Sequence, residues 1–150
     1  MFLRWLLATL HLLALGIGLG AIWVRGRALL RVTEGAGFRS VFLADTGWGI
    51  AFLLWLSTGL VRAFAGFEKG TDYYLHNPFF LTKMALFVII VVLEVRPMTA
   101  LIRWRIQLAK GAEPDRSLAP TLARISFLQT VLVVLMLMAA TAMARGLGMA

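Results

Sequence analysis

The chain has 150 residues, of which 61% are hydrophobic and 15% are charged, and its formal net charge is +8. A soluble domain is about half apolar and about a quarter charged, so this composition excludes an ordinary soluble globular protein. The chain has no cysteine, which excludes disulfides, thiolate metal sites, iron–sulfur clusters and thioether-linked haem. The basic residues lie between apolar blocks, which indicates contact with anionic lipid and no nucleic-acid partner.

The apolar residues form four blocks of about 20 residues, the length that crosses a hydrocarbon core of ~30 Å. One domain, residues 1–150, is therefore expected to hold membrane-spanning helices over about 5–24, 46–65, 79–95 and 122–144. The third helix is expected to continue past Pro97 as an interfacial helix to Lys110. Short loops make consecutive helices antiparallel neighbours. The predicted fold class is an all-α, integral membrane four-helix up-down bundle.

The orientation follows from the basic residues of the loops. The first loop holds Arg25, Arg27, Arg31 and Arg39, and the third holds Arg96, Arg103, Arg105, Lys110 and Arg116. The second loop has only Arg62 and Lys69 at its edges. Cytoplasmic loops carry the excess of Lys and Arg. We therefore expect a multi-pass protein of the bacterial inner membrane, with both termini on the outer, periplasmic side.

His11 is an ionisable residue inside the first span, where such residues are costly and often functional. Small residues share its helical face at three- and four-residue steps: Ala8, Ala14, Gly18 and Ala21, followed by Arg25. A small-residue face allows a second helix or a flat ligand to approach closely. Two interpretations remain open: a metal ligand, most naturally to haem iron, or a histidine hydrogen-bonded between helices.

Lys83 enters the third span on one stripe with Phe87, Ile90 and Glu94. Its ammonium either snorkels to the outer surface or faces inward and pairs with a carboxylate, such as a haem propionate. At ~1.5 Å per residue, Lys83 and His11 lie at similar depths, which predicts a shared outer site.

Two further side chains are candidate ligands at this outer depth. Met138 of the fourth span could be a second axial ligand opposite His11, although a methionine in an apolar helix is more often packing. His76 lies in the loop before Lys83, where it could fold in as a ligand or lie at the headgroups.

A second polar cluster is expected near the cytoplasmic side of the bundle. The acids Asp45 and Glu94 lie at a depth comparable to that of four arginines, Arg25, Arg27, Arg96 and Arg124. We interpret this cluster as a salt-bridge belt that fixes the helix ends. The alternative, a proton-entry site, lacks an evident polar path through the apolar middle of the bundle.

Three stretches resemble a bacterial family of predicted four-helix membrane proteins of unknown function. They are Arg4 to Leu13 with Gly18 to Ala21, Gly66 to Gly70 with Tyr73-Tyr74 and Asn77-Pro78, and Ala139 to Arg145. The resemblance covers nearly the whole chain and implies the same membrane architecture, with no established activity.

A more distant resemblance lies in a pair of residues, a histidine in the first helix (His11) and a lysine at the start of the third (Lys83). This pattern is similar to that of HemJ-type protoporphyrinogen oxidases and CopD-type copper-resistance proteins. HemJ-type proteins bind b-type haem through their first-helix histidine. The resemblance therefore implies that His11 is a haem ligand. Late in the third helix, HemJ-type proteins carry a Tyr-His pair, whereas this chain has Leu93-Glu94.

Two classes of function follow. In the first, the protein binds haem b or a porphyrin through His11, with Lys83 and Arg62 as charge partners. In the second, it is a cofactor-free accessory subunit of a larger respiratory or photosynthetic membrane complex, or a homo-oligomer, packed through Gly16 and Gly20. A transporter is the weakest reading, because a four-helix monomer has little interior for a pathway.

Overall fold

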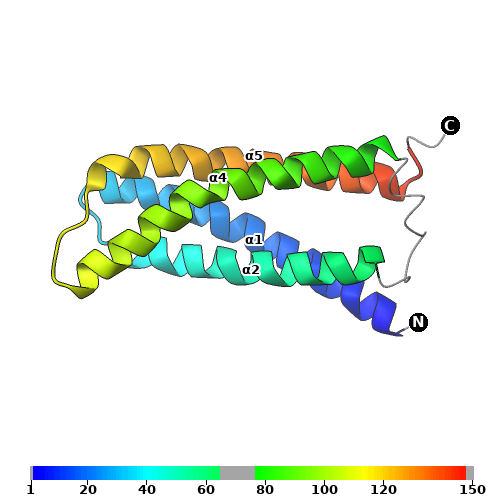
Figure 1. Ribbon diagram of the computed structural model, residues 1–150, viewed down its shortest axis with the longest axis horizontal. Helices are drawn as coiled ribbons and strands as arrows, with labels where there is room; N and C mark the ends of the chain where they lie inside the picture. The colour runs from blue at the N-terminus through cyan, green and yellow to red at the C-terminus, as the bar shows by residue number, and fades with distance from the viewer. Residues whose placement is uncertain (1, 65–76, 148–150) are drawn as a thin grey trace.

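A computed structural model describes residues 2–64 and 77–147 of the chain. These residues form four long helices, α1 (Phe2–Thr33), α2 (Arg39–Phe64), α4 (Pro78–Ala109) and α5 (Ala119–Ala144), with a 3-10 helix, η1 (Arg116–Leu118), before α5. The helices run up and down, so α1 begins and α5 ends at the same end of the bundle (Figure 1). All four are long and apolar enough to cross a membrane. The predicted all-α four-helix membrane fold is confirmed.

The helices near the first and third loops are longer than the spans expected from hydropathy. α1 continues through the first arginines to Thr33, where Gly35, with a φ of +93°, ends the helix in the left-handed conformation that glycine favours. α4 continues through Pro97 to Ala109, so the expected interfacial segment is the end of one 32-residue helix. Such a helix is ~48 Å long at 1.5 Å per residue, so its basic end extends beyond a ~30 Å hydrocarbon core.

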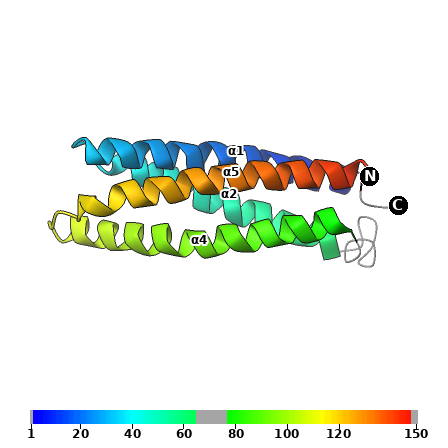
Figure 2. The same cartoon turned by 90° about the horizontal axis from the view of Figure 1, so that it is seen from above.

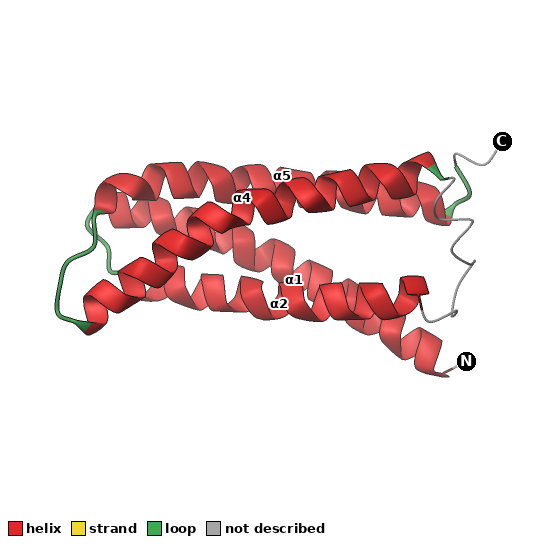
Figure 3. Ribbon diagram, viewed as in Figure 1, coloured by secondary structure: helices red, strands yellow, loops and turns green. Residues whose placement is uncertain are grey.

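Three helix pairs form the closest contacts of the bundle. α1 packs along α2 and along α5, and α4 packs along α5. Viewed from above, α5 lies between α1 and α4 (Figure 2). α2 and α4 meet through aromatic side chains: the ring of Phe87 stacks on Phe52 at 5.9 Å and lies 5.6 Å from the ring of Trp55. The loops lie at the ends of the bundle (Figure 3).

The small-residue face of α1 packs into the bundle, as the sequence predicts. Ala14, Gly18 and Arg25 are buried on it. A Cβ atom at Gly18 would lie 3.3 Å from the ring of Trp48, so the glycine allows α2 to approach closely. By contrast, Gly16 and Gly20 are exposed, and a Cβ atom at either position would have no neighbouring atom of the described chain within 4 Å.

Candidate functional site

Arg25 of α1 is fully buried near the end of the bundle at which α1 ends, and its side chain bonds to each of the other three helices. Its Nη1 donates to Oδ1 of Asp45 on α2 at 3.0 Å and to Oε1 of Glu94 on α4 at 2.7 Å. Its Nη2 donates to the other Glu94 oxygen at 2.8 Å. The paired guanidinium and carboxylate thus form a two-point contact, the geometry that makes such pairs strong.

α5 supplies the remaining acceptors of this guanidinium. Nε of Arg25 donates to Ser126 Oγ at 3.1 Å, and Nη2 donates to Gln129 Oε1 at 3.0 Å. The Gln129 amide in turn donates to Glu94 at 2.8 Å and to the Ile90 carbonyl at 3.1 Å. A guanidinium has five N–H donors, and all five are used here. The arrangement therefore stabilises the bundle and leaves Arg25 no donor for a ligand.

The predicted belt of charges is confirmed for Arg25, Asp45 and Glu94 and is wrong for three arginines. Arg27, Arg96 and Arg124 are exposed. Each lies two positions from a member of the network, and two residues turn a helix by about 200°, to its opposite face. The sequence analysis did not place Arg105 here, yet its Nη2 donates to Asp45 Oδ2 at 3.0 Å. It lies eleven residues, about three turns, after Glu94, so helical spacing could have identified it.

A second group of side chains forms a pocket towards the opposite end of the bundle, the end that the loop charges predict to face outward, and we call it the outer pocket. The pocket has a volume of about 90 Å³ and is lined by residues of α1, α2 and α4. His11 and Lys83 both line it, so the structure brings these two predicted residues together. Part of the wall is aromatic: the His11 ring stacks on Trp55 at 5.4 Å, and the Lys83 ammonium lies 5.4 Å from the centre of the Phe80 ring.

A hydrogen bond joins His11 on α1 to Thr58 on α2. Nδ1 of His11 and Oγ1 of the buried Thr58 are 2.9 Å apart. Oγ1 also lies 2.7 Å from the Leu54 carbonyl of its own helix, to which a threonine hydroxyl can donate. We therefore expect Thr58 to accept from Nδ1–H, the tautomer in which a neutral imidazole has its lone pair on Nε2. Metal-bound histidines show the same arrangement, in which the second ring nitrogen donates to a fixed oxygen.

Gly59 of α2 leaves space for the imidazole ring of His11. A Cβ atom at this position would lie 3.1 Å from Cε1 of His11 and 3.7 Å from Nδ1. A larger residue would thus displace the ring from Thr58.

The other predicted ligands are placed differently. Arg62 is half-buried and lies one turn beyond Gly59 on the same face of α2, farther out than the pocket lining. Met138 is 61% exposed on α5 and does not line the pocket, whereas Met136 is the buried methionine of this region. The two differ by two positions, so they point to opposite faces of the helix. His76 lies outside the described residues.

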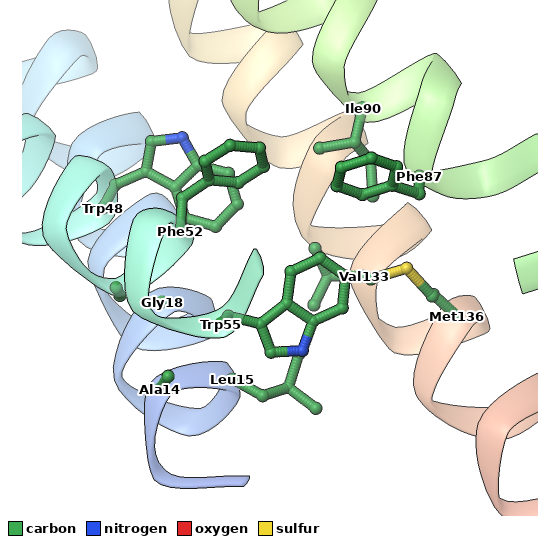
Figure 4. A pocket seen from close by; sticks show the side chains of 11 residues that line it. Ala14, Leu15, Gly18, Trp48, Phe52, Trp55, Phe87, Ile90, Val133 and Met136 are labelled. Carbon is green, nitrogen blue, oxygen red and sulfur yellow. The ribbon is translucent and has the colours of Figure 1, made fainter. Parts of the chain in front are cut away.

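An apolar cavity of about 20 Å³ lies at mid-bundle, between the outer pocket and the Arg25 network. Trp55 and Phe87 line both the outer pocket and this cavity. Its other walls are aliphatic or aromatic, including Trp48, Phe52 and Val133 (Figure 4). The two polar regions are thus separated by an apolar layer, which gives no support to a proton path between them.

The donor set of the outer pocket restricts the metals that it could hold. Among the described residues, no group of three or more His, Cys, Asp or Glu side chains could bind a metal ion. A single imidazole from the protein suffices only for a metal that brings its other ligands with it, as haem iron does.

Comparison with known proteins gives one match, to a family. Residues 3–148 match the family described as "Predicted membrane protein (DUF2214)". No curated protein and no solved structure matches the chain. Because the match covers nearly all of the sequence, this four-helix membrane protein belongs to the DUF2214 family of predicted membrane proteins.

Proposed function

We propose that the protein binds b-type haem or a related porphyrin at the outer pocket, with His11 as the ligand to the metal. The observation that carries the proposal is the hydrogen bond between Nδ1 of His11 and Oγ1 of Thr58, 2.9 Å long. With the Thr58 hydroxyl donating to Leu54, its oxygen would accept from Nδ1–H, and the lone pair of the neutral ring would lie on Nε2. An imidazole whose second nitrogen donates to a fixed oxygen is oriented for metal binding.

The other side chains of the pocket suit a flat, anionic ligand. Trp55, Phe80 and Phe87 offer aromatic surfaces, and Lys83 offers a cation to a propionate. Arg62, one turn farther out, is a second candidate for a carboxylate. The volume of about 90 Å³ is well below the ~300–1,000 Å³ of pockets that enclose whole cofactors. The pocket would therefore enclose only part of a haem or porphyrin.

Bound haem iron would supply one-electron redox chemistry, and the chain's own residues would orient the group and set its surroundings. His11 would fix the iron through Nε2, and Thr58 would hold the imidazole plane. Lys83 would orient the macrocycle by pairing with one of the propionate carboxylates. These roles support a redox or tetrapyrrole-related function in the membrane.

An absorption spectrum of the detergent-purified protein tests the proposal. Wild-type protein supplied with haem should show a Soret band and sharp bands after dithionite reduction. His11→Ala should lose these bands, while Met138→Leu, which changes the exposed methionine, should keep them. A colourless wild-type protein after haem addition would rule out the haem function.

A second candidate is a cofactor-free accessory subunit of a larger membrane complex, or a homo-oligomer. Gly16 and Gly20 favour it, because they form a small-residue pair on the exposed side of α1, where nothing from the described chain covers them. Such pairs let membrane helices approach closely. Gly20→Leu should abolish copurification of a partner while leaving the isolated bundle intact. Retained copurification in this variant would count against that surface.

We also propose that the protein lies in the bacterial inner membrane, with the arginine-rich loops in the cytoplasm and both termini outside. The chain has no cysteine, so single cysteines report topology directly. With a membrane-impermeant maleimide on spheroplasts, Leu147→Cys should label and Gly37→Cys should not. The reverse pattern would invert the topology.

A further inference from the structure

A second concave surface lies at the arginine-rich end of the bundle, on the outside of the α2–α4 pair. It is an open groove of about 630 Å³ between the start of α2, the end of α4 and the loop that leads to η1. Three arginines line it, Arg39, Arg105 and Arg116, and Glu113 is its one acidic residue. We refer to this surface as the arginine groove.

Two of these arginines are fixed by contacts within the chain. Arg116 donates from Nη1 to the carbonyls of Val32 at 3.2 Å and Ala36 at 3.0 Å. Its guanidinium lies 5.0 Å from the centre of the Phe38 ring, and Nη2 lies 3.6 Å from Glu113. Glu113 thus offsets Arg116, and Asp45, which Arg25 shares, offsets part of the charge of Arg105. The excess positive charge of the groove therefore lies mainly on Arg39.

One side of the Arg105 guanidinium is fixed by contacts within the chain. Its Cζ lies 4.8 Å from the centre of the Phe42 ring. Nη2 donates to Asp45, to Thr46 and to the Phe42 carbonyl. Among the described residues, Nη1 and Nε have no acceptor. Their N–H groups form a pre-oriented donor set of the kind that recognises a phosphate.

Arg39 stands at the first position of α2, where a cation is electrostatically unfavourable because the N-terminus of a helix carries a partial positive charge. The first turn of α2 holds no acidic residue to offset it. The exposed Arg39 side chain makes no hydrogen bond or ion pair with the rest of the described chain. A bound anion would remove this electrostatic cost.

Apolar side chains line the same groove. They are the ring of Phe42, Leu43, which is 64% exposed, and Leu108, which is 36% exposed. Leu43 lies one turn after Arg39 on the same face of α2, towards the middle of the bundle. From this geometry we infer that the arginine groove binds one anionic phospholipid, with its phosphate between Arg39 and Arg105 and an acyl chain that runs along Leu43 towards the middle of the bundle.

Native mass spectrometry of the detergent-purified full chain tests this inference, with phosphatidylglycerol and phosphatidylcholine as probes. One phosphatidylglycerol should be retained in preference to phosphatidylcholine. Arg39→Gln should weaken phosphatidylglycerol binding about fivefold, since one arginine near a lipid surface contributes about 1 kcal/mol. The matched control is Arg103→Gln, which removes an exposed arginine that does not line the groove, and it should leave binding unchanged.

Three outcomes would overturn the inference. Equal retention of the two lipids would exclude anion recognition, and an equal loss in Arg103→Gln would show a diffuse basic surface. The third probe is inorganic phosphate alone. If its thermal shift matches the shift with phosphatidylglycerol, and if Arg39→Gln abolishes it, the site binds free phosphate. The Arg39→Gln variant should fold normally, because no described contact depends on its side chain.

Discussion

The guanidinium of Arg25 and the carboxylate of Glu94 form a two-point ion pair, at 2.7 and 2.8 Å, across the interior of the bundle. The pair joins α1 to α4, two helices that are not among the closest backbone neighbours. Asp45 extends it to α2, and Gln129 extends it to α5. One buried side chain therefore connects all four helices at the arginine-rich end.

Removing one partner should destabilise the protein strongly, because Arg25 would remain buried with two unused donors. We expect Glu94→Ala to lower the free energy of unfolding by about 3–5 kcal/mol, the usual result for a broken buried pair. Unfolding in mixed micelles by SDS titration measures this change. Glu113→Ala, with a side chain that is 80% exposed, is the control and should change stability by less than about 0.5 kcal/mol.

The double variant Arg25→Met, Glu94→Met sharpens this prediction. Replacing a buried ion pair by apolar residues is often close to neutral, so the double variant should be more stable than Glu94→Ala. A Glu94→Ala protein as stable as the wild type would show that the network does not hold the helices together.

The contact of α1 with α5 should be sensitive to a single methyl group at Gly26. A Cβ atom there would lie 2.8 Å from Cε1 of Phe127, whose ring packs against Trp23 at 5.1 Å. We expect Gly26→Ala to lower the free energy of unfolding by about 1–3 kcal/mol, the cost of overpacking. Gly20→Ala is the matched control, since nothing lies within 4 Å of its Cβ, and it should not destabilise the chain. Equal stability of the two variants would contradict the packing of Phe127.

The four spans and their order were predictable from the sequence, because blocks of about 20 apolar residues have few other structural solutions. The ends of the helices were less predictable. Hydropathy marks where the hydrocarbon core ends, whereas α1 continues to Thr33 because Ala28, Leu29 and Val32 of its last turns pack into the core of the bundle. Likewise, Pro97 did not end α4, because a long membrane helix tolerates one missing N–H.

Within the sites, helical spacing was informative only where a polar or small residue marked one face. The small-residue face below His11 packs inward. The stripe from Lys83 to Glu94, for which the sequence left two orientations open, lines the outer pocket and reaches the Arg25 network. Spacing could have oriented Met138, because the buried Gln129 marks the inner face of α5. Met136 lies seven residues later on that face, whereas Met138 lies nine residues later on the opposite one. By contrast, the Thr58 contact was hidden, since it depends on the register between α1 and α2.

Asp115 offers a test of the connector before α5, outside the membrane spans. Its Oδ1 accepts from the Ser117 backbone N–H at 2.9 Å, and its Oδ2 accepts from the Ser117 hydroxyl at 2.7 Å. These hydrogen bonds hold the pKa of the Asp115 carboxyl below its ordinary value. The turn is therefore stabilised above the unfolded pKa of about 3.9, and the stabilisation is lost as the pH falls through the lower folded value.

A ¹³C NMR titration should thus show an Asp115 pKa below about 3.9. Ser117→Ala should raise this pKa, because the hydroxyl donor is removed, while Ser40→Ala at the same end of the bundle should leave it unchanged. An Asp115 pKa that does not respond to Ser117→Ala would mean that the hydroxyl does not stabilise the carboxylate.

The tautomer of His11 is the most direct test of the outer pocket, because it precedes any question of cofactor. ¹⁵N NMR of the neutral imidazole should show the proton on Nδ1, since the Thr58 oxygen lies 2.9 Å away and its own proton is donated to Leu54. Thr58→Val keeps the shape of the residue and removes the acceptor, so the proton should no longer favour Nδ1. Thr58→Ser should retain the wild-type spectrum.

The same variants connect this hydrogen bond to haem binding. Loss of a residue that orients a metal-bound histidine typically weakens metal affinity about 10–100-fold. Thr58→Val should therefore bind haem less tightly by a similar factor, and Thr58→Ser should bind haem as tightly as the wild type. If the wild-type proton lies on Nε2 instead, that nitrogen is a donor and not a ligand. His11 would then be an interhelical hydrogen-bonding residue, and the pocket would lose the observation that assigns it to a haem.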